Sequence, residues 1–338
     1  MKFGILKNRL RLSCALLKRK KLYGGVPQEI IVEVTNRCNL RCLMCVRTYR
    51  DIKEKDLSLD EFGILLENIP FQTEQISFAG LGEPLLNPGL SFMIEQCQKR
   101  GLKSVLYTNA VLLNARPSTD LIKAGLSAIV ISFDGADAST YEYYRRGAKF
   151  AEVRSNILNF LKIKRTLGSS VTVEMQLIIL KRTIPEIKSF LRVWSLPGIN
   201  SVRIKNDHMR VLKEDDLKDS VILAKRQGMC AMPWRGPATI DVKGDVYPCC
   251  VGSEHNLILG NIFKESMECL WNSSLANELR SNFAVRGFKL SSCKGCYIPL
   301  PPLFFCVSGT LINPSLVHRA LASIERAYHL KIRKVTSQ

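Results

Sequence analysis

The chain has 338 residues, 46% of them hydrophobic and 23% charged, which is the composition of a globular protein with a core of its own and room for about two domains. No run of about 18 uncharged apolar residues predicts a transmembrane helix, and the basic N-terminus lacks the apolar segment of a secretory signal. Twelve cysteines without an export signal favour ligands and thiols in a reducing cytoplasm, and a net charge of +19 favours anionic partners.

Residues 1–28 are predicted to form a basic amphipathic N-terminal segment, because apolar residues recur in it at helical spacing. Eight basic residues and no acid occur in the first 25 residues. Four apolar residues lie between them at helical spacing: Phe3, Leu6, Leu10 and Leu17. Three interpretations stay open: a helix in peripheral contact with the anionic inner face of a membrane, a patch for a phosphorylated or nucleic-acid substrate, and a solvated helix packed on the fold. The C-terminal tail, residues 301–338, is basic in the same way.

From residue 29 to residue 212 the pattern alternates between strands and helices. Strands are predicted at residues 29–35, 75–79, 103–108, 128–133, 171–180 and 201–205. Helices are predicted at residues 58–69, 88–100, 118–124, 152–167 and 185–194, with Ser58 and Glu61 as a capping box for the first. Nearly continuous apolar strands indicate a parallel sheet covered by helices. The expected fold is α/β, a partial (β/α)6 TIM-like barrel with its chemistry at the carboxyl ends of the strands.

Three cysteines follow the first predicted strand. The segment VTNRCNLRCLMC spaces Cys38, Cys42 and Cys45 as C-x3-C-x2-C, with no fourth cysteine nearby. Three thiolates can ligate three irons of a 4Fe-4S cluster, which leaves one iron open for chemistry. A structural zinc site is the alternative, but zinc takes four ligands and commonly uses paired C-x2-C units. The spacing therefore favours an iron-sulfur cluster.

Glycines and polar residues follow the next three predicted strands, at the same edge of the sheet. The candidates are Gly80, Gly82 and Glu83 in AGLGEP, Asn109 after the third strand, Ser132 and Asp134 in ISFDG, and Arg145 in YEYYRRG. Glycine lets a backbone approach a ligand closely, and a carboxylate such as Glu83 can bind an ammonium group. Each motif by itself is also typical of a turn, a cap or a solvated charge, and Arg146 is chemically as suitable as Arg145.

A charged linker at residues 213–228 separates this barrel from a small domain at residues 229–300, which is rich in Cys, Pro and Gly. A hairpin is predicted at residues 239–247. The candidate ligands are Cys230 before the hairpin, Cys249 after it, and the C-x2-C pair of Cys293 and Cys296. Four such thiolates would fully ligate one cluster, although zinc stays open on spacing and Cys250 competes with Cys249.

The cysteine loop resembles that of the radical S-adenosylmethionine (radical SAM) superfamily. The resemblance implies that SAM chelates the open iron through its amino and carboxylate groups. It implies that reductive cleavage of SAM at the cluster gives a 5′-deoxyadenosyl radical that abstracts hydrogen from substrate. Cys38, Cys42 and Cys45 would be the catalytic ligands. The residues that match cofactor-binding positions of the family are Met44, Gly80, Gly82, Glu83, Asn109, Ser132, Asp134 and Arg145. Met44 stands where the family usually has an aromatic residue.

The second domain resembles the SPASM or shortened twitch extension of many radical SAM enzymes. Gly260-Asn261-Ile262 and Leu270-Trp271-Asn272 match its usual intervening sequence. A full SPASM domain has seven cysteines and two auxiliary clusters, whereas about four suitably placed cysteines occur here. The resemblance therefore implies one auxiliary 4Fe-4S cluster.

The expected function is a radical SAM, oxidoreductase-like enzyme that oxidises or modifies a carbohydrate-like, lipid-linked or other anionic small molecule. Its electron donor would be of the flavodoxin or ferredoxin type. Modification of a peptide or protein side chain is the alternative within the class. A non-catalytic, zinc-stabilised basic nucleic-acid-binding protein is the alternative from another class. We do not expect nucleic acid as a partner, because that alternative leaves Glu83, Asn109 and Asp134 unexplained.

Overall fold

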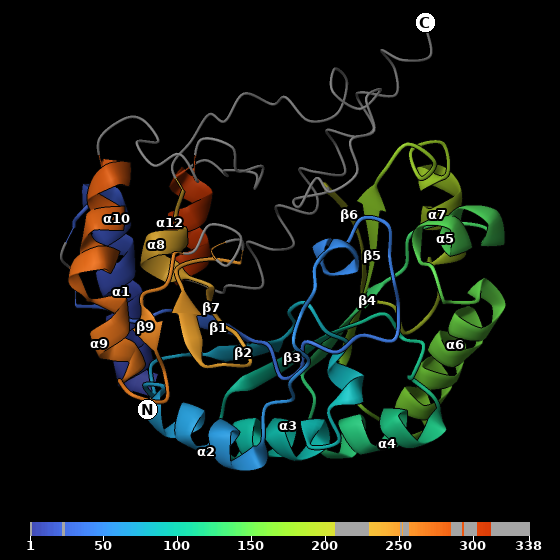
Figure 1. Ribbon diagram of the computed structural model, residues 1–338, viewed down its shortest axis with the longest axis horizontal. Coiled ribbons are helices and arrows are strands. Elements are labelled where there is room, and N and C mark those ends of the chain that lie inside the picture. Colours follow the sequence, from blue (N-terminus) through green and yellow to red (C-terminus); the bar gives the residue numbers. More distant parts are fainter. Residues whose placement is uncertain are drawn as a thin grey trace, which may run out of the picture. The chain divides into compact units, whose positions relative to one another are not determined.

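The computed structural model describes residues 2–21, 24–206, 230–250, 252, 257–284, 293 and 303–311, and its elements are labelled in Figure 1. The chain divides into two compact units. The first holds Met1–Val32, Leu57–Ile76 and Ala224–Ser323, and the second holds Glu33–Asp56, Ser77–Leu223 and Ile324–Gln338. Among the described residues, no helix combines the length and apolar character needed to cross a membrane.

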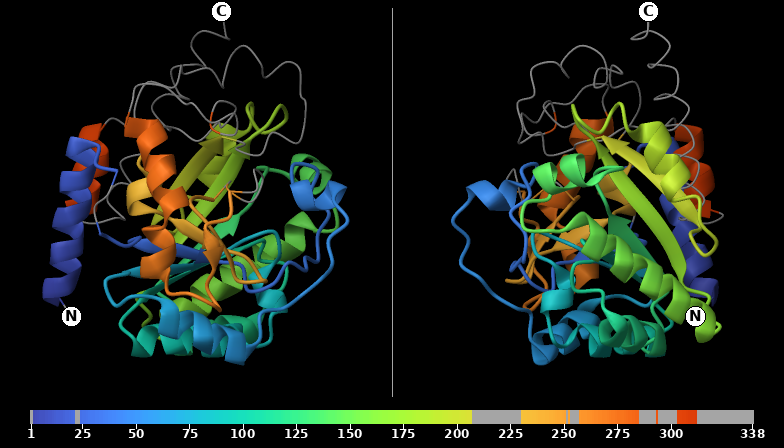
Figure 2. Two further views of the ribbon diagram at one scale, coloured as in Figure 1. Left: turned by 60° about the vertical axis from the view of Figure 1, so that its left-hand side comes forward. Right: turned by 90° about the vertical axis from the view of Figure 1, so that its right-hand side faces the viewer.

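The second unit is built on parallel strands. Its sheet contains β3 (Lys103–Thr108), β4 (Ala128–Ser132), β5 (Thr172–Ile179) and β6 (Ser201–Asn206), each parallel to the next. β2 (Gln75–Phe78), whose last two residues belong to this unit, neighbours β3. Apolar helix side chains such as Met93, Ile157 and Phe190 are buried. The helices are α3 (Leu90–Lys99), α4 (Ala115–Lys123), α5 (Ala138–Tyr144), α6 (Phe150–Thr166) and α7 (Ile187–Val193), shown from two further directions in Figure 2.

The strand register brings polar side chains of three strands to one face of this sheet. Ser132 of β4 lies opposite Gln176 of β5, which lies opposite Arg203 of β6. Two residues further along, Ile178 lies opposite Lys205. Residues that are opposite in a parallel sheet share a face. Ile178 packs against a buried cluster that includes part of the cysteine loop. We call this the interior face, because it is the face turned toward the cysteine loop.

The first unit continues in a different way. β1 (Glu29–Val32) pairs in parallel with β7 (Ala238–Ile240), and antiparallel pairs lead on to β8 (Asp245–Tyr247) and β9 (Gly260–Asn261). The predicted hairpin at residues 239–247 is thus confirmed. The partnership of β1 with β7 was not predicted, because so short a strand shows no period that would identify its neighbour. The helices of this unit are α1 (Lys2–Lys18), α2 (Leu59–Asn68), α8 (Met232–Arg235), α9 (Met267–Trp271), α10 (Ser274–Ala284) and α12 (Leu303–Leu311).

Local capping explains where helices begin. Ser58 and Glu61 form the predicted capping box, with Glu61 N donating to Ser58 Oγ at 3.1 Å and Ser58 N donating to Glu61 Oε2 at 2.9 Å. Helix α4 begins earlier than predicted, because Asn114 caps it. The predicted linker at residues 213–228 lies outside the described residues. So does the C-terminal tail, except for the stretch that forms α12.

Candidate active site

The loop with Cys38, Cys42 and Cys45 lies in the second unit and ends in the short helix η1 (Val46–Tyr49). All three cysteines are half-buried thiols outside any disulfide. Backbone hydrogen bonds hold the loop to the last residue of α5 and to the segment that follows it. Leu43 N donates to Tyr144 O at 2.9 Å, and Arg41 N donates to Arg146 O at 3.0 Å. Burial raises the pKa of the Cys42 thiol to about 12 against the opposing charge of Arg145, so ligation of a metal there must displace a proton.

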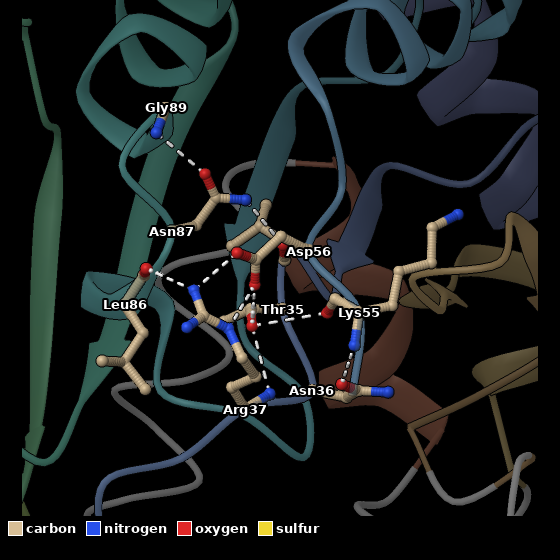
Figure 3. A network of polar contacts seen from close by, with 9 residues as sticks. Thr35, Asn36, Arg37, Lys55, Asp56, Leu86, Asn87 and Gly89 are labelled. Atoms are coloured by element: carbon tan, nitrogen blue, oxygen red, sulfur yellow. Dashed lines mark hydrogen bonds and ion pairs between the residues drawn. The ribbon is translucent and has the colours of Figure 1, made fainter. Parts of the chain in front are cut away.

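A polar network fixes the entrance to this loop (Figure 3). Arg37 donates from Nε to Asp56 Oδ1 at 2.9 Å and from Nη2 to Asp56 Oδ2 at 2.5 Å, and Nη2 also donates to Leu86 O at 3.0 Å. Thr35 Oγ1 donates to the same carboxylate at 2.6 Å. Burial acts to raise the pKa of Asp56, but the hydrogen bonds from Arg37 and Thr35 outweigh it and hold this pKa below its usual range. Sequence reasoning missed this network, because nothing local pairs residue 37 with residue 56.

The glycine segment after β2 packs against the backbone that leads into the cysteine loop. A Cβ on Gly82 would lie 2.1 Å from Thr35 O and 2.6 Å from Arg37 O, and a Cβ on Gly80 would lie 2.4 Å from Glu33 Oε2. Leu81 N donates to Glu33 Oε2 at 2.5 Å. Only glycine therefore permits this close approach between the glycine segment and the backbone that leads into the cysteine loop.

Glu83 is the buried carboxylate of the site. Its Oε1 accepts from Thr108 Oγ1 at 2.7 Å, and its Oε2 accepts from Asn109 N at 2.8 Å. Burial raises the pKa of Glu83, and these hydrogen bonds act in the opposite direction. A carboxylate has about four acceptor positions, so a ligand ammonium can still be bound. Asn109 Nδ2 lies 4.0 Å from Cys38 Sγ, which places the cysteine loop, Glu83 and Asn109 together.

Asp134 and Arg145, both predicted to bind the cofactor, form a buried ion pair. Arg145 Nε donates to Asp134 Oδ2 at 2.8 Å. Arg145 Nη2 lies 2.6 Å from the same oxygen. The other oxygen, Oδ1, accepts from Ile178 N at 2.7 Å. Asp134 is fully buried and Arg145 is 7% exposed, whereas Arg146 is exposed. Of the two arginines, Arg145 is therefore the one inside the site, beside Cys42.

The other predicted cofactor-binding residues lie around these groups. Met44 is buried and packs with Leu43, Tyr144 and Leu180, so it supplies an apolar wall. Ser132 is half-buried on the interior face, level with Gln176. The second unit thus gathers the candidates from the cysteine loop, the glycine segment and the ends of β3 and β4.

The auxiliary cysteines belong to the first unit. Cys230 and Cys293, far apart in sequence, pack against one core cluster formed by Leu12, Ala15, Leu16, Ala231, Trp234 and Cys306. Cys249 is half-buried just beyond β8, and Cys250 is exposed. Cys296 lies outside the described residues. Within the described part of the chain, no three His, Cys, Asp or Glu side chains are grouped as a single metal ion would require.

Both parts of the chain match known families. Residues 32–186 match the radical SAM superfamily and residues 230–297 match SPASM, an iron-sulfur cluster-binding domain, and together they cover more than half of the chain. The chain belongs to the radical SAM superfamily and carries a SPASM-type domain. It is an enzyme that uses SAM and a 4Fe-4S cluster, with auxiliary iron-sulfur binding in the SPASM region. The predicted partial-barrel α/β fold is confirmed, and the non-catalytic zinc protein is excluded.

Three similar proteins illustrate the range of the family. A tungsten-containing aldehyde ferredoxin oxidoreductase cofactor-modifying protein of Pyrococcus furiosus is 21% identical over 79% of this chain and 86% of its own. SuiB of Streptococcus suis, solved with the precursor peptide SuiA, has a TM-score of 0.63 at 16% identity over 84% of this chain and 72% of its own. BtrN, solved with AdoMet and 2-DOIA, has a TM-score of 0.52 at 19% identity over 80% of this chain and 93% of its own. Several other curated relatives match over less than half of their own length.

Proposed function

We propose that this radical SAM enzyme oxidises or otherwise modifies an anionic small molecule, carbohydrate-like or lipid-linked, by abstracting a hydrogen atom. The supporting observation is the cationic character of the interior face. Arg203 lies opposite Gln176, and Lys205 lies opposite Ile178, which packs against the cysteine-loop cluster. Arginine and lysine on this face of β6 suit phosphate or carboxylate groups of a substrate.

In this proposal the described residues hold the cofactor in defined roles. Cys38, Cys42 and Cys45 ligate three irons, a donor set that leaves one iron for SAM. Glu83 accepts hydrogen bonds from the SAM ammonium group, and Gly80 and Gly82 let the backbone come close. The Asp134–Arg145 pair and Asn109 set the shape and charge of the pocket, with Ser132 and Met44 along its wall. With SAM bound, the cluster supplies the 5′-deoxyadenosyl radical that takes hydrogen from the substrate.

For the SPASM region we propose one auxiliary 4Fe-4S cluster ligated by Cys230, Cys249, Cys293 and Cys296. The shared packing of Cys230 and Cys293 supports this set. Cys249 is preferred to Cys250 because it is half-buried rather than exposed, and cluster ligands need a site with little solvent. A substrate radical could pass an electron to such a cluster, which suits an oxidation.

Anaerobic reconstitution tests the two clusters. We expect about eight irons per chain and release of 5′-deoxyadenosine when SAM and a reductant are added. Replacing Cys38, Cys42 and Cys45 by Ala should leave about four irons and abolish SAM cleavage. Cys269→Ser, at an exposed cysteine of α9, is the matched control. Retention of all iron in the triple variant would contradict the assignment.

The substrate class is tested by substrate-dependent 5′-deoxyadenosine release with pools of sugar phosphates, nucleotide sugars and short peptides. We expect stimulation by the anionic small molecules, weakened by added salt. Arg203→Gln and Lys205→Met should remove the stimulation but keep the basal cleavage of SAM. Arg192→Gln, exposed at the end of α7, should change neither. Stimulation by peptides alone would support the second candidate, peptide modification, which the likeness to the fold of peptide-bound SuiB favours.

Two further partners belong to the proposal. The clusters need a one-electron donor, for which a flavodoxin or ferredoxin of the cytoplasm is suited. The second partner is a membrane surface, in peripheral contact with the basic termini. Of these termini the structure describes α1 and, in the C-terminal region, α12.

A further inference from the structure

Helix α1 buries the face opposite to its most apolar stripe. Its buried positions include Asn8, Leu12, Ala15 and Leu16, which pack into the core of the first unit. The apolar side chains at helical spacing point outward instead: Phe3 is 79% exposed, Leu6 50%, Leu10 54% and Leu17 58%. The first unit therefore holds α1 firmly by one face and leaves a second apolar face in solvent.

The exposed apolar residues are confined to a narrow stripe. With 3.6 residues per turn, Phe3, Leu6, Leu10 and Leu17 fall within about 60° of the helix circumference. Phe304 of α12, a helix in contact with α1, is another apolar side chain that is 75% exposed. Isolated exposed apolar residues are common in globular proteins, but a continuous patch marks an interaction surface.

One edge of the stripe is cationic. Lys7, Arg11 and Lys18 are exposed and follow each other along it, and α1 contains no acidic residue. At the same edge Lys7 and Arg11 line a cavity of about 180 Å³ together with Phe71, Gln72 and Glu268. This volume is smaller than the pockets of drug-sized ligands, which start near about 300 Å³.

We propose that this stripe docks on an anionic phospholipid bilayer. The apolar side chains enter the boundary between headgroups and acyl chains, and Lys7, Arg11 and Lys18 contact lipid phosphates. Charge complementarity favours this occupant over a second copy of the chain. Helix α1 of a second copy would offer the same cationic edge and no acidic side chain to pair with it, in a protein with a net charge of +19. The inference deepens the membrane contact named in the proposed function and does not depend on the substrate.

Co-sedimentation of the reconstituted enzyme with vesicles tests this surface. We expect binding to mixed phosphatidylcholine–phosphatidylglycerol vesicles that weakens with salt, and much weaker binding to pure phosphatidylcholine. The double variant Leu6→Gln, Leu10→Gln should bind more than about tenfold more weakly, since two apolar side chains leave the interface. Lys7→Gln and Arg11→Gln should each weaken binding about fivefold.

The matched control replaces Phe92, an apolar residue of α3 that is 47% exposed, by Gln. This variant should bind vesicles as strongly as the unaltered enzyme. All variants should keep their melting temperature, iron content and vesicle-free SAM cleavage, so failure here is separate from failure of the proposed chemistry. Unchanged vesicle binding by the Leu6, Leu10 variant would overturn the proposal. A dimer in analytical ultracentrifugation that this variant abolishes, without binding to anionic vesicles, would also overturn it and assign the stripe to a second copy.

Discussion

Asp134 is a buried residue that connects several elements. Its carboxylate accepts from the Arg145 guanidinium through one oxygen and from the Ile178 amide through the other, so it links the end of α5 to β5. Burying a charge is costly unless the charge is paired and hydrogen-bonded. Because both oxygens are engaged inside the second unit, the pair positions the pocket as much as it offers a charge to a ligand.

Replacing Asp134 by Asn should therefore destabilise the apoprotein by about 3–5 kcal/mol, because a buried guanidinium loses its counter-charge. Arg145→Lys should cost less, because an ammonium keeps the charge but not the planar fork. Urea denaturation measures both values. The control is Lys149→Ala in the exposed pair with Glu142, which should change stability by less than about 1 kcal/mol. Equal effects of Asp134→Asn and Lys149→Ala would refute this account of the pair.

Gly82 is a residue whose absent side chain matters. Gly82→Ala should displace the backbone at Thr35, because the new Cβ would lie 2.1 Å from its carbonyl oxygen. We expect less iron at the cluster proposed for Cys38, Cys42 and Cys45, measured by iron analysis. We also expect loss of SAM binding, measured by calorimetry. Gly63→Ala in the middle of α2 meets nothing within 4 Å. It should instead stabilise the protein by about 0.5–1 kcal/mol, since Ala favours the helix over Gly.

At the scale of elements, strands were more predictable than short helices. The apolar runs located β3 at its observed bounds and the other strands of the second unit within one or two residues. Helix α5 was missed, because its N-cap and first residues, Asp137 to Thr140, are typical of a turn and the helix spans only Ala138–Tyr144. The motif residues of the site could be located because they follow strands. Their partners, such as Asp56 for Arg37, could not, because that pairing exists only once the chain has folded.

Asp137 caps α5, with Thr140 N donating to its Oδ1 at 3.0 Å. Asp137→Ala should cost about 1 kcal/mol at neutral pH. The Thr140 amide lowers the pKa of Asp137 in the folded state, so its stabilisation is complete above the unfolded pKa and is lost as the pH falls through the folded one. The difference between wild type and variant, measured by urea denaturation, should therefore shrink below about pH 4. Asp120→Ala, in an exposed pair on α4, should show little effect at any pH, and a larger loss there than at Asp137 would contradict this prediction.

At the scale of the molecule, the first unit is assembled from remote parts of the chain. Leu12 and Leu16 of α1 share one core cluster with Trp234 and Cys306, and Cys230 and Cys293 pack against it. Trp234 Nε1 also donates to Lys20 O at 2.8 Å. The basic N-terminal helix therefore supports two of the cysteines that we propose as auxiliary ligands. Sequence periodicity could not predict this packing, because the more apolar stripe of α1 is the exposed one.

Leu12→Ala should lower the free energy of unfolding by about 2–5 kcal/mol and reduce retention of the auxiliary cluster. Leu10→Ala, two residues away but 54% exposed, should change stability by less than about 0.5 kcal/mol. Thermal unfolding and iron analysis measure the contrast between the two variants. On storage, the Leu12 variant should lose about four irons per chain. Equal behaviour of the two variants would mean that α1 does not support the auxiliary site.

The hydrogen bond from Arg9 Nη1 to Leu311 O joins residues 302 positions apart, and Gln28 Nε2 likewise donates to Thr310 O. On a ribosome that adds about 5–20 residues per second, α1 emerges some 15–60 s before its helical partner α12 exists. Until then Leu12 and Leu16 of α1 can pack only against the parts of this core that have already been made, such as Ala231 and Trp234. The order of synthesis thus means that α1 completes its packing only after α12 has been made, long after its own synthesis.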